Sequence, residues 1–303
     1  MIHRASGRAN RRAQLATTDE SVHPMSSGLS APSIQQTGDL VLLAALAQAA
    51  LKAGAVILRI RAEGAATQYK ADYSPVTAAD LASEELLRAE LAAILPGVPV
   101  IAEEAVAEGR GESPADAFLL VDPLDGTREF VSASGEFTVN IGLVVDGVPA
   151  FGIVYGPAVE RLYAGATFAS GAARAFRAHR EAGALADAPG WEPIACRPIP
   201  AHGLVAVASR SHLDADTRAL LDGLDVAERI SIGSALKFGL VAEGRADLYP
   251  RLGTVCEWDV AAGHAVVRAA GGSVRRPDGS PLPYGRTAEN YRVPAFIAYG
   301  AEA

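Results

Sequence analysis

The chain is poor in cysteine and in net positive charge. Of its 303 residues only 2 are cysteines, and 27 basic residues stand against 35 acidic ones, for a formal net charge of -8. Cys196 and Cys256 are too few for a disulfide framework and lack the paired spacing of a zinc site, so we expect a reducing, cytoplasmic environment. The acidic balance argues against nucleic acid or an anionic membrane as a partner bound through bulk electrostatics.

Long apolar runs are also scarce, with one exception at Leu40 to Leu58. Gln48 and Lys52 lie near its centre, where a lysine in a membrane span costs about 2.5–3.5 kcal/mol. We therefore predict a buried helix and no integral membrane segment. Residues 1–37 are rich in Ser, Ala, Gln and Arg without apolar periodicity, and we predict that they form a disordered N-terminal extension.

What the chain does contain is a mixture of helical and strand patterns. Half of the residues are hydrophobic, enough for a sizeable core. Helices are expected, from caps and periodicity, at 40–58, 78–95, 234–243 and 259–270. Strands are expected at 98–102, 117–121, 137–145, 148–155, 161–165, 204–208 and 246–251. Without an internal repeat, this order predicts an α+β fold of layered sheets and helices over 38–302, with subdomains at about 38–170 and 200–302 that are separated by a loop-rich stretch.

The segment Asp122-Pro-Leu-Asp-Gly-Thr127 is the strongest candidate for a site. Asp122 and Asp125 are three residues apart on a turn that Pro123 stiffens, and two carboxylates so placed can serve a hard divalent cation from one face. Gly126 permits backbone conformations closed to other residues, and Thr127 adds a hydroxyl. An ordinary Asp-rich turn, whose side chains bond only their own backbone, is an equally good interpretation of this segment alone.

Further acidic residues stand at the ends of other expected elements. Glu103-Glu104 follows a strand and Asp259 begins a helix, so they could converge with the aspartates on one cleft. The alternatives remain open: Asp259 would serve equally well as a helix cap, Asp80 forms a capping box with Thr77, and Glu104 could be a solvated neighbour.

These residues carry a resemblance to a known family. Val76-Thr-Ala-Ala-Asp80, Ala102-Glu-Glu104, Asp122-Pro-Leu-Asp-Gly-Thr127 and Trp258-Asp-Val-Ala-Ala-Gly263 resemble, in order and spacing, the motifs of the inositol monophosphatase superfamily of magnesium-dependent, lithium-sensitive phosphatases. Further segments are similar to its 3'(2'),5'-bisphosphate nucleotidase branch: Gly135-Glu-Phe-Thr-Val-Asn140, Ser209-Arg-Ser-His212, Gly233-Ser-Ala-Leu-Lys-Phe238 and Leu248-Tyr-Pro-Arg251. The resemblance implies the layered αβαβα sandwich of the sugar phosphatases.

The resemblance also implies roles for individual residues. It assigns two or three Mg²⁺ ions to Glu103, Asp122, the Leu124 carbonyl, Asp125 and Asp259. It gives catalytic roles to Asp80, Glu103 and Thr127. These residues would position and activate a water molecule that hydrolyses the phosphate ester in one step. It places the substrate against Glu103, Leu124, Asp125, Gly126, Thr127, His212, Ser234, Lys237, Arg251 and Asp259.

The implied substrate is a small nucleotide bisphosphate. The resemblance indicates hydrolysis of the 3'-phosphate of adenosine 3',5'-bisphosphate to AMP and phosphate, with 3'-phosphoadenosine 5'-phosphosulfate as a further substrate, in sulfur assimilation. It also implies a cytoplasmic protein, at times peripheral on the inner membrane, and it allows a homodimer. The alternatives are an inositol-1-phosphatase or another sugar-phosphate phosphatase, and a noncatalytic nucleotide or metal sensor.

Overall fold

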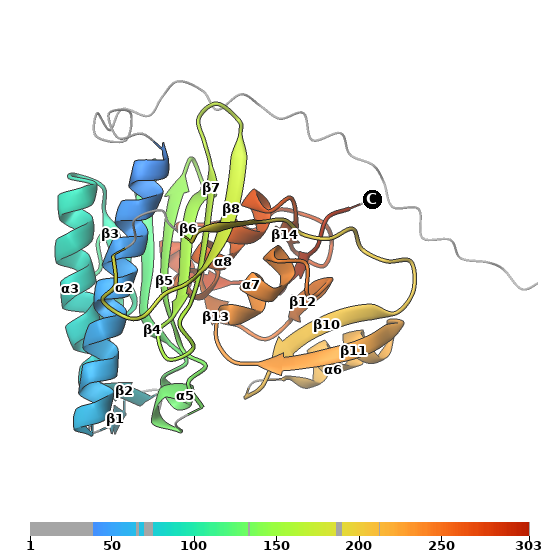
Figure 1. The fold of residues 1–303 in the computed structure, drawn as a ribbon, viewed down its shortest axis with the longest axis horizontal. Coiled ribbons are helices and arrows are strands. Elements are labelled where there is room, and N and C mark those ends of the chain that lie inside the picture. The colour runs from blue at the N-terminus through green and yellow to red at the C-terminus, as the bar shows by residue number, and fades with distance from the viewer. Residues whose placement is uncertain are drawn as a thin grey trace, which may run out of the picture.

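Two β-sheets and three layers of helices stack on one another in the order α, β, α, β, α (Figure 1). The computed structural model describes residues 39–64, 67–69, 75–132, 134–185, 190–211 and 213–302. Helices α2 (Asp39–Glu63) and α3 (Ala78–Ile94) cover one face of the larger sheet, and α7 (Leu236–Ala242) and α8 (Glu257–Ala269) fill the space between the sheets. Helix α6 (Ala215–Asp222) covers the outer face of the smaller sheet. The predicted layered sandwich is confirmed.

The larger sheet has the strand order β3-β4-β5-β6-β7-β8-β9. Its strands are β3 (Val100–Ala102), β4 (Ala117–Asp125), β5 (Thr138–Val145), β6 (Val148–Gly156), β7 (Arg161–Thr167), β8 (Ala173–His179) and β9 (Glu192–Ile194). Only the β3–β4 pair is parallel, which sets the ends of these two strands side by side. Short helices follow each of them, α4 (Glu103–Ala107) and α5 (Thr127–Val131).

The smaller sheet has the strand order β11-β10-β12-β16-β14. Its strands are β10 (Leu204–Ser209), β11 (Val226–Ile232), β12 (Leu248–Arg251), β14 (Ser273–Arg275) and β16 (Phe296–Tyr299). The remaining elements are the pairs β1 (Thr67–Tyr69) with β2 (Pro75–Thr77) and β13 (Val255–Cys256) with β15 (Arg292–Val293), and the 3₁₀ turn η1 (Thr287–Glu289).

Three glycines let helix α8 lie directly on the backbone of the larger sheet. Gly142, Gly152 and Gly165 are aligned across β5, β6 and β7. A Cβ atom on Gly152 would lie 2.1 Å from the carbonyl oxygen of Ala262, and one on Gly165 would lie 2.5 Å from the Cα atom of Val266. Because no larger residue fits under the helix, this row of glycines determines how closely α8 approaches β5, β6 and β7.

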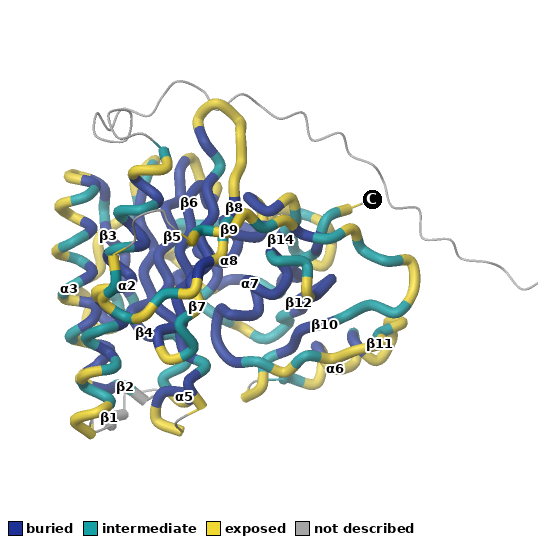
Figure 2. Tube along the Cα trace, viewed as in Figure 1, coloured by how far each residue is buried: buried dark blue, intermediate teal, exposed yellow. Residues whose placement is uncertain are grey.

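Helix α2 is long and apolar enough to cross a membrane by length and composition, and an 18-residue window within it has a mean hydropathy of 2.0. It lies instead against α3 and the larger sheet, and much of its length is coloured as buried or intermediate (Figure 2). Leu43, Leu46 and Leu51 are fully buried in the hydrophobic core between α2 and this sheet. The interpretation as a buried core helix is confirmed.

The boundary region between the two expected subdomains differs from the expectation. We expected a loop-rich stretch from about residue 166 to 200, yet β8 and β9 continue the larger sheet there. Exposed charged residues lie on both faces of β8, because Arg174 and Arg177 are three residues apart in a strand whose side chains alternate. They break the apolar alternation that would predict a strand. The predicted extension at 1–37 lies outside the described residues, and the division into subdomains stays a prediction.

Candidate metal centre

The site begins at the end of strand β4, which carries Asp122 and Asp125. We expected a turn here, but β4 continues through Asp125 and pairs with β5 at Asp122↔Asn140 and Asp125↔Thr138. One extra residue on β4 between these pairs makes a bulge, because Pro123 has no N–H to give to the ladder. The bulge turns Asp122 inward, where it is 2% exposed and its Oδ1 accepts a hydrogen bond of 3.0 Å from the Leu124 amide.

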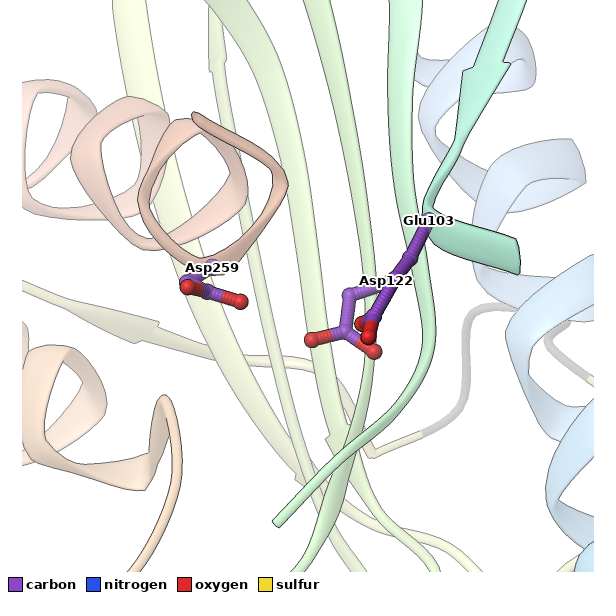
Figure 3. Close-up of side chains that lie close together, drawn as sticks. All are labelled: Glu103, Asp122 and Asp259. Atoms are coloured by element: carbon purple, nitrogen blue, oxygen red, sulfur yellow. The ribbon is translucent and has the colours of Figure 1, made fainter. Parts of the chain in front are cut away.

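Two other acidic side chains meet Asp122 from different elements. Glu103 is the first residue of α4, directly after β3, and its place follows from the parallel pairing Ala102↔Val121. Asp259 lies in the first turn of α8, on the other side (Figure 3). One carboxylate oxygen from each of the three residues lies within 4.8 Å of the others. The structure therefore brings together three acids that are separated by up to 156 residues in sequence.

The electrostatics of this group are unfavourable without a cation. Burial raises the pKa of Asp122 well above its ordinary value, and Glu103, Asp125 and Asp259 raise it further. Burial, followed by the charges of Asp125 and Glu103, raises the pKa of Asp259 to about 7. Neighbouring like charges in a desolvated place favour protonation unless a counter-charge is present. A hard divalent cation with oxygen ligands supplies that counter-charge, and the donor set of this group fits one.

Asp80 and Thr127 form a second feature beside the three acids. Asp80 Oδ2 accepts hydrogen bonds from the Thr77 amide and hydroxyl, each of 2.7 Å, so the expected capping box of α3 is present. Asp80 Oδ1 accepts a hydrogen bond of 3.2 Å from Thr127 Oγ1. The two interpretations of Asp80 are thus compatible, because each uses a different oxygen. Burial raises the pKa of Asp80, while the bonds from Thr77 and Thr127 oppose the shift.

Asp259 likewise combines a capping contact with a place in the acidic group. Its Oδ2 accepts a hydrogen bond of 2.7 Å from the Cys256 amide, which completes a capping box at the start of α8. Gly126 connects β4 to α5 in a left-handed conformation, with φ of 91°. This turn brings Thr127 back toward β4, so that its Oγ1 lies 3.4 Å from the carbonyl oxygen of Leu124.

The second half of the chain contributes a cationic end to the site. Lys237 is 4% exposed, and its Nζ donates to the Ser234 carbonyl and lies 5.3 Å from the centre of the Tyr249 ring. Burial, with the nearby charge of Arg251, lowers the pKa of Lys237 to about 8, and Asp125 opposes this shift. Arg251 lies at the end of β12 with its Nε donating to the Gly253 carbonyl. His212, the remaining expected contact, lies outside the described residues.

Several residues of the site were not singled out from the sequence. Glu84 on α3 accepts hydrogen bonds from the amides of Glu104 and Ala105 and thereby holds the start of α4. Thr138 and Asn140 are fully buried in the apolar strand β5 beside Asp125. The sequence does carry a signal for these two residues, since both are polar and lie on the same face of an otherwise apolar strand. Buried polar groups need hydrogen-bond partners, so such a pair indicates a polar site next to the strand.

Known proteins resemble this chain in sequence and in fold. Residues 39–295 match the model of the inositol monophosphatase family. The 3'(2'),5'-bisphosphate nucleotidase CysQ of Escherichia coli (strain K12) is 42% identical over 227 residues, which cover 75% of this chain and 86% of that protein. The crystal structure of CysQ from Bacteroides thetaiotaomicron is 37% identical with a TM-score of 0.71, covering 88% of this chain and 98% of that one. The inositol monophosphatase of Anabaena (Nostoc) sp. PCC 7120 is 27% identical with a TM-score of 0.64, covering 86% and 91%.

Proposed function

The chain belongs to the inositol monophosphatase family, and from this premise we propose that it is a Mg²⁺-dependent phosphatase that hydrolyses the 3'-phosphate of adenosine 3',5'-bisphosphate to AMP and phosphate. The observation that carries the proposal is the group of Glu103, Asp122 and Asp259, in which one carboxylate oxygen from each residue lies within 4.8 Å of the others. The name of the relative that is 42% identical, a 3'(2'),5'-bisphosphate nucleotidase, supports the nucleotide substrate. The reaction would serve sulfur assimilation in the cytoplasm.

The metal ligands in this proposal come from strand β4 and from the first turns of helices α4 and α8. Glu103, Asp122, the Leu124 carbonyl, Asp125 and Asp259 would hold two or three Mg²⁺ ions, with Asp122 shared between ions because it is the most central and most buried acid of the group. Bound Mg²⁺ supplies a lowered pKa for a water molecule and neutralises charge on the phosphate oxygens. The mutual repulsion of the carboxylates makes such binding favourable.

The protein's own groups position the attacking water. Thr127 donates its only hydroxyl proton to Asp80, so its oxygen is left to accept a hydrogen bond from that water. Asp80 in turn is held by Thr77, which keeps the pair oriented. Glu103 lies beside Asp122 and is the candidate to take the proton of the water as a general base.

The cationic end would bind the rest of the nucleotide. Lys237 and Arg251 are close enough that the charge of Arg251 lowers the pKa of Lys237, and a bound phosphate would relieve this repulsion. Since Ser234 lies between Lys237 and Asp125, the metal end and the cationic end share one short segment of chain. This arrangement fits a substrate with two phosphate groups better than one with a single phosphate.

A substrate panel with purified protein and Mg²⁺ tests the proposal. We expect the highest kcat/KM for adenosine 3',5'-bisphosphate or its 5'-phosphosulfate analogue, and a lower value for inositol 1-phosphate, which lacks the second anionic group. Lys237 also donates to the Ser234 carbonyl, so its variant is assayed at saturating Mg²⁺. Under that condition Lys237→Met should raise KM for the bisphosphate and change the hydrolysis of inositol 1-phosphate much less. A preference for inositol 1-phosphate would contradict the proposal, and tight binding of nucleotide without any turnover would indicate a sensor.

A further inference from the structure

The two oxygens of Asp125 have different surroundings. Oδ2 accepts hydrogen bonds from Ser234 Oγ at 2.6 Å and from the Ala235 amide at 2.7 Å. Thr138 and Asn140 on β5 contribute longer contacts to the same oxygen, at 3.4 and 3.5 Å. The hydrogen bonds that the described residues give to the Asp125 side chain all end on Oδ2. This oxygen is saturated by two short bonds, so Oδ1 is the oxygen that Asp125 can offer to a cation.

The backbone of Ser234 is arranged to make this contact. Ser234 has φ of 55°, a left-handed conformation that is unfavourable for residues other than glycine. In this conformation its hydroxyl and the amide of the following residue, Ala235, point at the same oxygen of Asp125. A glycine would adopt the conformation without strain but would lack the hydroxyl. A strained serine here therefore indicates that the hydroxyl has a function.

The segment around Ser234 is anchored on both sides. The Gly233 amide donates a hydrogen bond of 2.8 Å to Glu136 Oε2, and Glu136 Oε1 pairs with Arg210 at 2.9 Å. On the other side, Lys237 donates to the Ser234 carbonyl. Glu136 precedes β5 of the larger sheet, while Arg210 follows β10 of the smaller one. The orientation of Asp125 thus depends on the contact between the two halves of the molecule.

We propose that Ser234 is a positioning residue for the metal site: its hydroxyl holds Oδ2 of Asp125 so that Oδ1 faces the Mg²⁺ ions. The inference rests on the proposed function, because it takes Asp125 as a metal ligand. It differs from the role expected from the resemblance, in which Ser234 contacts the nucleotide. A positioning role acts on metal affinity even when no nucleotide is present.

Titration calorimetry with Mg²⁺, in the absence of nucleotide, tests the inference. Ser234→Gly removes the hydroxyl and relieves the left-handed strain, whereas Ser234→Ala removes the hydroxyl and keeps the strain. We expect both variants to bind Mg²⁺ about 10- to 100-fold more weakly than the wild type, the usual effect of losing a group that orients a ligand. Ser231→Ala, which changes an exposed serine three residues earlier, should bind like the wild type.

The double variant Ser234→Gly/Asp125→Asn shows whether the effect passes through Asp125. Asp125→Asn alone should weaken Mg²⁺ binding, and the additional change at Ser234 should then have no further effect. Unchanged affinity in Ser234→Gly, with a raised KM for the nucleotide only, would overturn the inference, as would a full additional loss in the double variant. If the wild type itself showed no Mg²⁺ binding, the proposed function would fail together with the inference.

Discussion

Replacing Asp122 by asparagine should stabilise the metal-free protein and abolish its response to Mg²⁺. Two unit charges 4.8 Å apart, the limit within which the three acids lie, repel each other by about 3.5 kcal/mol at an effective dielectric constant of 20. Partial protonation already relieves some of this repulsion, so we expect a gain of about 1–3 kcal/mol in the free energy of unfolding without metal. For a domain of this size each kcal/mol raises Tm by about 2–4 °C. Asparagine can still accept the hydrogen bond from the Leu124 amide.

Thermal unfolding of Asp122→Asn in EDTA and in Mg²⁺ measures both effects. The wild type should gain about 2.7 kcal/mol when Mg²⁺ is present at a hundred times its Kd, and the variant should gain almost nothing. Turnover should be lost at any Mg²⁺ concentration. Asp216→Asn, which neutralises an exposed carboxylate on α6, should match the wild type in both conditions. A lower Tm of the metal-free Asp122→Asn protein would refute the reasoning, as would a wild-type response to Mg²⁺ or retained activity.

Two further predictions concern stability. His264 is buried with its Nδ1 atom 2.9 Å from the Tyr284 hydroxyl, and burial lowers its pKa to about 3. The imidazole therefore takes up a proton near pH 6.5 only in the unfolded chain. Lowering the pH from 7.5 to 5.5 should for this reason reduce the free energy of unfolding by about 1.4 kcal/mol. Urea unfolding of His264→Gln should show a correspondingly smaller loss, and equal pH dependence in both proteins would contradict the assignment. Gly152→Ala places a Cβ atom 2.1 Å from the Ala262 carbonyl oxygen and should destabilise the protein by about 1–3 kcal/mol or more. Gly223→Ala is the matched control, because its Cβ atom would lie 3.5 Å from the nearest atom, the Leu220 carbonyl oxygen, which is an ordinary contact. Equal stability of the two variants would show that α8 can shift to make room for the added atom.

Short-range patterns predicted most of the elements correctly. The capping box of Thr77 and Asp80 marked the start of α3, and apolar runs marked β5 and β6. Where the prediction was wrong, a longer-range contact was responsible. Pro123 predicts a turn from Asp122 to Asp125, yet pairing with β5 keeps this segment in the sheet as a bulge. β8 forms for the same kind of reason, because its pairing with β7 outweighs the charged residues on both of its faces.

By itself, the sequence determined the family and the layered fold and predicted which acidic residues form the site, because caps, periodicity and motif spacing are local properties of the chain. The tertiary structure alone decided which of these residues meet. Asp259 reaches Asp122 because glycines under α8 let the helix lie on the sheet. Ser234 reaches Asp125 across 109 residues because the two sheets pack against a shared helical layer. Such contacts arise from the packing of distant surfaces, and no local pattern along the chain encodes their distances.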